Sequence, residues 1–225
     1  MNLAEELKNI QLSFYKQGFV HLKNIFSKSE IINLRKSFIK YKKNQNKNLI
    51  KVLHIEKKIK NVKKIMSHSY LLYLLKFILK MENIVCLQTE AFFNPPKTKG
   101  YGLHQDDYFL ATGKNNSANL WIPLVKTNRN NGSLKFLKNS NKLKILKKKN
   151  RENLESTNEN KYKKSQIINV NCNIGDAILI SNTVFHGSGR NNSKTNRYVL
   201  AVGYMREGSK FRKGFTAKRK PFKIS

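Results

Sequence analysis

Two histidines and one aspartate in this sequence have the types and spacing of ligands for a single metal ion. His104 and Asp106 stand two residues apart in a strand-like run. Because alternate residues of an extended chain point to the same face, both side chains are predicted to project into one interior. His186 follows an apolar run at 177–180 and adds a second imidazole at the end of another buried strand. Two histidines and one carboxylate on one face of a metal, with the other positions open, are typical of non-haem Fe(II) oxygenases.

Arg197 gives this metal hypothesis further support. It opens an apolar run in which its side chain is predicted to share a face with Val199 and Ala201, so that a guanidinium enters an apolar interior. A buried arginine needs an anionic partner, and the distal carboxylate of a small dicarboxylic acid would accept a bidentate pair of hydrogen bonds from it. The alternative is an arginine whose charged head reaches solvent at the end of the strand.

The remaining histidines lack such a context. A His-x-Asp pattern alone is common by chance, and a single histidine is more often an ordinary core or surface residue. No carboxylate or strand accompanies His21, His54 or His68 in the sequence. These three are therefore predicted to be structural rather than metal-binding.

The elements that must position the candidate site change in character near residue 83. Before this point the chain is predicted to be mostly helical, with apolar residues at helical spacing in 3–14, a short strand at 19–22, a helix capped by Ser27 or Ser29, and a further helix at 65–81. After it, short runs of β-type composition alternate with Pro, Gly and Asn turns. These runs are 85–93, 102–109, 118–125, 133–137, 167–172, 177–180 and 197–205.

This order of elements predicts an α+β, mainly β fold. Helices followed by a block of strands indicate a sandwich or barrel with the helices packed on one outer face. We expect one domain over residues 1–225, with a mostly helical part at 1–82, a β core at 83–205 and a basic tail at 206–225. The polar, Lys-rich interval 139–165 within the core is predicted to be a long loop or a lid.

The chain is strongly basic, because its 45 Lys and Arg residues against 13 Asp and Glu residues give a net charge of +32 among 225 residues. The lysines are spread over nearly every segment together with abundant Asn and Ile, as a compositional bias would produce. No named nucleic-acid motif accompanies them, so nucleic acid is not the expected partner. Two clusters remain candidate anion-contacting surfaces, at 142–151 with 161–164 and at 210–223. On a lid, the first would attract an anionic substrate.

Cysteine content and hydropathy favour a cytoplasmic protein. Cys86 and Cys172 are too few to form a disulfide framework, which suits a reducing compartment. The N-terminus lacks the pattern of a secretory signal. The most apolar stretch, 70–81, is interrupted by Lys76 and Lys80 and is shorter than the roughly 20 residues that span a bilayer, so it is predicted to be a core helix. The oligomeric state is not predicted.

An ordered set of motifs resembles the phytanoyl-CoA dioxygenase family of Fe(II)/2-oxoglutarate oxygenases. The resemblance extends to 14–34 and covers most of the chain apart from 139–165. Its motifs are Gln88, Phe92-Phe-Asn-Pro-Pro, His104-Gln-Asp, Trp121, Asn130-Asn-Gly-Ser-Leu, Gly175-Asp-Ala, His186-Gly-Ser-Gly-Arg-Asn and Arg197.

The resemblance implies a cupin-like double-stranded β-helix, or jelly roll, and a set of site residues. His104, Asp106 and His186 would be the Fe(II) ligands. Arg197 and Ser188 would bind the distal C5 carboxylate of 2-oxoglutarate, while Gln88 and Trp121 fall near positions that contact this cosubstrate in relatives. The implied activity is hydroxylation with O2 as cosubstrate and release of succinate and CO2. Asp106 favours hydroxylation because the halogenases of the family lack the metal carboxylate.

Two other readings remain open at this stage. One is a cupin-type metalloenzyme that does not use 2-oxoglutarate, and the other is a basic module that binds nucleic acid or another anionic polymer. The substrate is expected to be a small or carrier-linked metabolite, possibly anionic, and fold analogy does not identify it.

Overall fold

The computed structural model describes residues 2–45, 49–145, 162–212 and 219–224. Its strands are β1 Phe19–Leu22, β2 Lys51–Leu53, β3 Ile84–Asn94, β4 Ser117–Pro123, β5 Leu134–Leu137, β6 Ile167–Val170, β7 Ala177–Ser181, β8 His186–Ser188 and β9 Arg197–Arg206. They form a six-stranded sheet in the order β1-β7-β4-β9-β3-β2 and a three-stranded sheet in the order β6-β5-β8. The strand pairs in both sheets are antiparallel.

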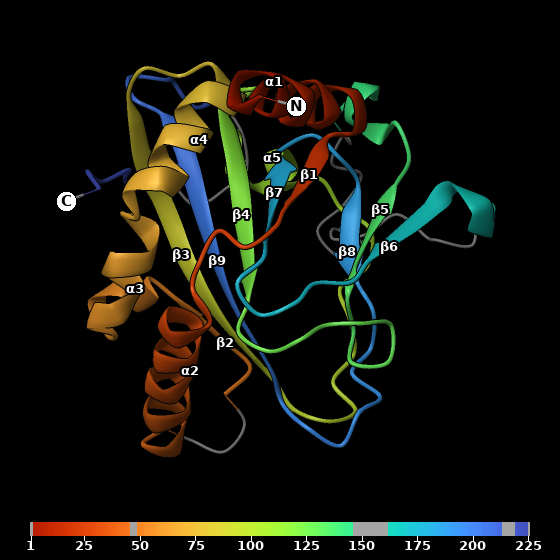
Figure 1. Cartoon of the computed structure of the whole chain (residues 1–225). Helices are drawn as coiled ribbons and strands as arrows, with labels where there is room; N and C mark the ends of the chain where they lie inside the picture. The colour runs from red at the N-terminus through yellow and green to blue at the C-terminus, as the bar shows by residue number, and fades with distance from the viewer. Residues whose placement is uncertain (1, 46–48, 146–161, 213–218, 225) are drawn as a thin grey trace.

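Helices cover the larger sheet on the side away from the smaller one (Figure 1). They are α1 Leu3–Gln17, α2 Lys28–Lys43, α3 Lys60–Met66 and α4 Ser69–Leu79, while the short helix α5 Asp106–Leu110 lies within the β region. Helix α2 begins after Ser27 because the Ser27 hydroxyl accepts from the Glu30 backbone N–H while the Glu30 carboxylate accepts from the Ser27 N–H. The predicted α+β arrangement, with helices on one outer face, is confirmed.

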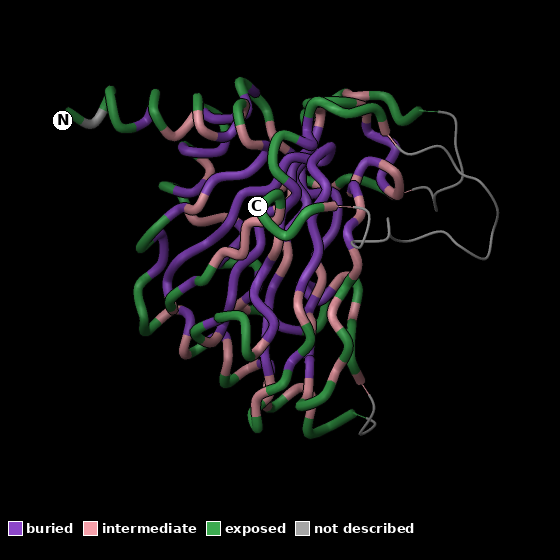
Figure 2. The backbone as a smooth tube through the Cα atoms, turned by 90° about the vertical axis from the view of Figure 1, so that its right-hand side faces the viewer, coloured by how far each residue is buried: buried purple, intermediate pink, exposed green. Residues whose placement is uncertain are grey.

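The alternation of side chains along the central strands creates two apolar layers. On β9, Leu200 and Val202 face the helices and join the larger core cluster, whereas Val199 faces the smaller sheet and joins a second cluster with Trp121 and Phe136. Figure 2 shows buried residues running along the strands and exposed residues gathering at the turns. The space between the two sheets is the interior into which Arg197 was predicted to point.

Two predicted elements differ from the observed ones. The predicted helix at 65–81 is divided into α3 and α4, because His68 adopts a non-helical conformation and its ring accepts a hydrogen bond from the Leu71 N–H as the N-cap of α4. The predicted strand at 102–109 does not form. Isolated bridge positions are confined to Leu103 and His104, of which His104 pairs with His186, and the chain turns into α5 from Asp106 onward.

Short pairing segments were not predicted from the sequence. Strands β2 and β8 have three residues each, too few to show an alternating pattern. In the C-terminal tail, Phe222 forms a β-bridge with Cys86 on β3. Within the described residues, no helix is long and apolar enough to cross a membrane.

Candidate metal and cosubstrate site

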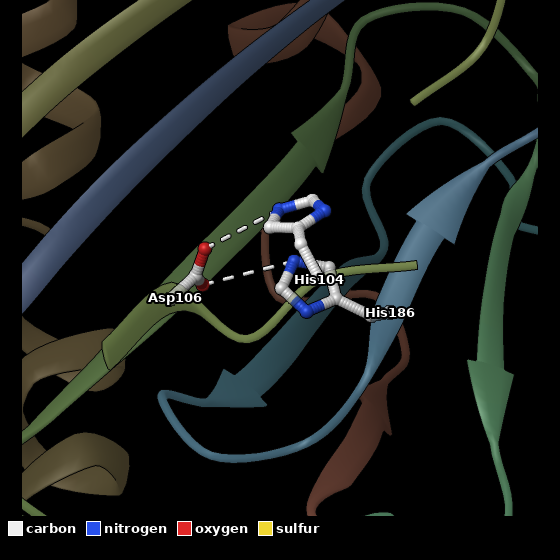
Figure 3. A group of neighbouring side chains, drawn as sticks. All are labelled: His104, Asp106 and His186. Carbon is white, nitrogen blue, oxygen red and sulfur yellow. Dashed lines mark ion pairs between the residues drawn. The ribbon is translucent and has the colours of Figure 1, made fainter. Parts of the chain in front are cut away.

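His104, Asp106 and His186 come together between the two sheets (Figure 3). The backbones of His104 and His186 exchange two hydrogen bonds of 2.9 Å, which place their rings side by side. Asp106 begins helix α5, so its carboxylate meets His104 through a turn of the chain rather than along the extended strand that was predicted. One ligand atom from each of the three residues lies within 4.8 Å of the others, a spacing that can hold one metal ion.

Backbone carbonyls orient both imidazole rings toward the centre of this group. The Nδ1 atoms of His104 and His186 lie 2.9 and 3.2 Å from the carbonyl oxygens of Gly102 and Val184. Since a carbonyl only accepts, each Nδ1 carries a proton, and Nε2 is the atom of each ring that faces the centre. The Nε2 atoms lie 3.6 and 3.7 Å from the two carboxylate oxygens of Asp106.

The pKa values of Asp106 and His186 suit metal binding. Burial disfavours a charged Asp106, but His186, His104 and the Asn119 amide outweigh this effect and lower the pKa of Asp106 to about 2. Burial lowers the pKa of His186 to about 4. For His104, burial opposes the charged form, but contact with Asp106 raises the pKa above its usual value. At neutral pH, Asp106 is therefore charged and His186 is neutral, which are the states that ligate a metal.

A cavity of about 560 Å³ surrounds this group and extends between the sheets. At one end the buried Arg197 donates from Nη1 to the Gly132 carbonyl, and its Nε is buried with no hydrogen-bond partner among the described residues. Burial lowers the pKa of Arg197 to about 10, so the guanidinium is still protonated at neutral pH. Ser188 lines the cavity nearby, and its hydroxyl accepts from the Tyr101 N–H. An unpartnered guanidinium N–H in a buried cavity fits a carboxylate ligand.

Gln88 and Trp121 also line the cavity, but Gln88 lies far along the sheet from Arg197. Gln88 pairs with Gly203 on β9, whereas Asn94 pairs with Arg197, six residues away along the strand. The Gln88 side chain donates to Glu90 and accepts from Arg219. Trp121 pairs with Ala201, which lies between Arg197 and Gly203 along β9. The roles of Gln88 and Trp121 toward the cosubstrate stay predictions.

Three residues outside the predicted set of site residues lie at or beside the site. Asn119 on β4 donates to the Asp106 carboxylate over 2.6 Å. Asp107 is fully buried and accepts hydrogen bonds from Thr112, Gly113, Asn182 and Arg212, which anchors helix α5 behind Asp106. Arg219 in the C-terminal tail lines the cavity. The Asp106-Asp107 pair was a local signal for the second of these, and Arg219 belongs to the basic cluster 210–223 that the sequence offered as an anion-contacting surface. Asn119 carries no such signal.

The Lys-rich segment predicted as a lid lies partly outside the described residues, which omit 146–161. Its described flanks contribute nothing to the lining of the cavity. Asn141 instead donates to the Tyr15 carbonyl and accepts from Thr183, near the end of α1. The lid therefore stays a prediction, and the described cations of the cavity come from other segments.

Comparison with known proteins agrees with this geometry. A model of the phytanoyl-CoA dioxygenase family matches residues 14–199. The chain belongs to the phytanoyl-CoA dioxygenase family. The predicted family is therefore confirmed, and this member is an Fe/2-oxoglutarate-dependent oxygenase. A comparison with curated proteins found no match.

Three solved structures illustrate how widely this dioxygenase-family fold is used. The epimerase SnoN, in complex with Fe3+, α-ketoglutarate and nogalamycin RO, has 13% identity and a TM-score of 0.79 over 99% of this chain and 96% of that chain. The non-haem monooxygenase ThoJ has 17% identity and a TM-score of 0.78 over 95% and 83%. The α-ketoglutarate-dependent carbocyclase SnoK from nogalamycin biosynthesis has 15% identity and a TM-score of 0.75 over 92% and 87%. These likenesses confirm the predicted double-stranded β-helix.

The cofactors of this dioxygenase-family member are iron and 2-oxoglutarate, as predicted. Its own residues fit both groups. Two imidazoles and one carboxylate form a donor set suited to Fe(II), and the buried Arg197 Nε without a partner fits the far carboxylate of a dicarboxylic acid.

Proposed function

We propose that this oxygenase hydroxylates an unactivated C–H bond of a small-molecule substrate. The observation that carries the proposal is the position of Asp106, whose carboxylate stands within metal-binding distance of His104 and His186. When bound, iron and 2-oxoglutarate supply the oxidising chemistry, in which one O2 and one 2-oxoglutarate convert R–H to R–OH with release of succinate and CO2. A site that lacked the carboxylate would leave room for a halide at the metal.

Different residues of the chain would bind the iron and the 2-oxoglutarate. His104, Asp106 and His186 would hold the iron from one side. Arg197 and Ser188 would bind the distal carboxylate of 2-oxoglutarate, which fixes the cosubstrate at one end of the cavity. Because Arg197 is almost fully buried, a bound carboxylate there is shielded from competing water.

The walls of the cavity would orient the substrate. Phe109, Leu110, Trp121 and Ile180 give it apolar surfaces, and a polar group of side chains lies on β2 and β3. A cavity of this size and composition suits a small organic molecule that is held by apolar contact and aligned by a few polar groups. Apolar walls also limit the access of water to the reacting carbon.

The decisive experiment separates hydroxylation from the other reactions that this fold supports. Anaerobic addition of Fe(II) and 2-oxoglutarate to the full-length chain should produce a weak visible charge-transfer band. Substrates are then found by screening small metabolites for those that stimulate succinate formation, and the reaction is repeated under 18O2.

We expect the product to gain one 18O atom per succinate formed. A product of unchanged mass would indicate epimerisation, and loss of two hydrogens without 18O would indicate ring closure. Either result would contradict the hydroxylase proposal. Absence of the charge-transfer band would contradict the assigned metal and cosubstrate residues.

A further inference from the structure

We propose that Arg219, in the C-terminal tail, binds an anionic group of the primary substrate, so that the substrate is a carboxylic acid or a phosphate ester. This inference rests on the proposed function and names the class of molecule on which it acts. Arg219 lines the same cavity as the metal group and reaches it from a segment that follows the last strand of the sheet.

The tail is held in a defined position by backbone pairing. Phe222 and Cys86 exchange two N–H···O hydrogen bonds of 2.9 Å at the edge of β3. The Phe222 side chain packs against the core cluster beneath the helices. Arg219 lies shortly before Phe222 in the chain, separated from it by Lys220 and Pro221. Its side chain enters the cavity beside Gln88.

Hydrogen bonds orient the guanidinium. Its Nε donates to the Gln88 side-chain oxygen, and its Nη1 donates to the Phe109 carbonyl over 3.1 Å. Gln88 is held in turn by its own hydrogen bond to Glu90. Arg219 is half-buried, so its side chain is already ordered and partly desolvated before a ligand arrives. Both conditions favour binding of a carboxylate or phosphate by arginine.

The position of Arg219 separates it from the cosubstrate end of the cavity. Gln88, its partner, pairs with Gly203, and Gly203 is six residues from Arg197 along β9. At about 3.3 Å per residue, the two levels are roughly 20 Å apart along the strand. The chain of contacts from Arg219 to the metal group runs through Gln88, Gly203 and Asn119 to Asp106. The metal group is therefore approached by Arg197 from one end and by Arg219 from the other.

Cations and carboxylates lie together at the Arg219 end of the cavity. Glu90 forms an ion pair of 2.9 Å with Lys51 from β2, so these two charges offset each other. The carboxylates of Glu90 and Asp106 both act electrostatically on Arg219, and a metal ion bound at Asp106 would offset the second of these charges. Among the tail residues that the structure describes, Arg219 alone lines the cavity, whereas Lys220 and Lys223 are exposed. Arg219 is therefore the cation that the described part of the tail contributes to the cavity.

The test uses the full-length chain with Fe(II) and 2-oxoglutarate under anaerobic conditions. Octanoate, octyl phosphate and the neutral octanamide are titrated while the visible charge-transfer band is monitored, because a molecule that binds beside the metal perturbs this band. We expect at least one of the two anions to bind about tenfold or more tightly than octanamide. Which anion binds better distinguishes an acid substrate from a phosphate ester.

Substitutions then test whether Arg219 causes the preference for an anion over octanamide. Arg219→Gln should abolish the advantage of the anion over octanamide and leave the affinity for 2-oxoglutarate unchanged. Arg219→Lys should retain part of it, because the charge remains but the forked geometry is lost. Lys223→Gln removes an exposed charge from the same tail and should change nothing. Thermal unfolding of each variant checks that the fold is kept.

Several outcomes would overturn the proposal. They are equal binding of the anions and octanamide to the original chain, an unchanged preference in Arg219→Gln, and a loss confined to 2-oxoglutarate affinity, which would place Arg219 at the cosubstrate. If the original chain shows no band before any probe is added, the proposed function fails instead. The same probes are then measured by calorimetry on the metal-free chain, where an Arg219-dependent anion preference would still support the anion site and its absence would reject it.

Discussion

The side-chain amide of Asn119 donates a 2.6 Å hydrogen bond to Oδ2 of Asp106, and this contact depends on the glycine at position 203 of the adjacent strand. A Cβ atom at Gly203 would stand 2.8 Å from the Asn119 side-chain oxygen and 3.3 Å from Gln88 Cγ. The Asn119 side chain thus occupies the space that a side chain at position 203 would fill, and it holds the Asp106 carboxylate that faces both histidines. Such hydrogen bonds to a metal ligand fix its orientation.

Asn119→Ala should weaken Fe(II) binding about tenfold or more, because Asp106 loses the partner that orients it. Gly203→Ala should act in the same direction by displacing the amide. The measurement is the Fe(II) dissociation constant, together with the position of the visible band. Ala substitution at the exposed Asn33 serves as a control. An unchanged dissociation constant in both site variants would show that Asp106 needs no such support.

His104→Ala and His186→Ala should each abolish Fe(II)-dependent succinate formation while the chain stays folded. Each imidazole is one of only three protein ligands in the proposed site, so its loss removes a large share of the metal affinity. Succinate assays and circular dichroism check the two parts of this expectation. His68→Asn is the matched control, because it removes an imidazole outside the cavity and keeps a residue that caps α4 well. Turnover at the original rate in either alanine variant would contradict the ligand assignment.

Arg197→Ala should lower the apparent affinity for 2-oxoglutarate at least about tenfold, because a charge-assisted hydrogen-bond pair is lost from a buried site. The Michaelis constant for 2-oxoglutarate is measured with Fe(II) in excess. Arg190→Ala, which removes an exposed arginine, should leave this constant unchanged. If Arg197→Ala behaved like the control, 2-oxoglutarate would not bind through Arg197 even if iron binding were normal.

Asp176 is predicted to contribute to stability in a pH-dependent way. Its carboxylate accepts from the backbone N–H groups of Asn24 and Asn173 and lies 2.9 Å from His21 Nε2. Burial opposes its charged form, but these three contacts outweigh burial and lower its pKa. Because the folded pKa lies below the unfolded value of about 3.9, its contribution is fully present above that value and is lost as the pH falls through the folded pKa.

Asp176→Asn should therefore destabilise the chain by about 1–3 kcal/mol at pH 7, and the difference from the original chain should shrink as the pH falls below 4 or so. Urea unfolding at a series of pH values measures both effects. Glu82→Gln, at an exposed position, should change the free energy of unfolding by no more than about 0.5 kcal/mol. A difference that grew on acidification would have the wrong sign for a carboxylate of lowered pKa.

The sequence by itself determined the features that local patterns encode. Period-two alternation placed Arg197, Val199 and Ala201 on one face of β9, and all three line the cavity. The capping signal at Ser27 or Ser29 located the start of α2, and Ser27 is the N-cap in the structure. The order of helices and strands indicated the fold class, and the combined motifs indicated the family and its cofactors. These inferences succeeded because each depends on residues that are neighbours in the chain or on a whole set of motifs in order.

Tertiary structure alone decided the contacts between segments that are remote in the chain. His21 was assigned no carboxylate, yet the pairing of β1 with β7 brings it to Asp176. The strand predicted at 102–109 gave way to α5, where the buried Asp107 gathers partners from two loops and the tail. Arg219 lines the cavity from a tail that Phe222 joins to the edge of β3. Strand register and the docking of the tail set these distances, and both are decided by the packing of the whole core rather than by any local run of residues.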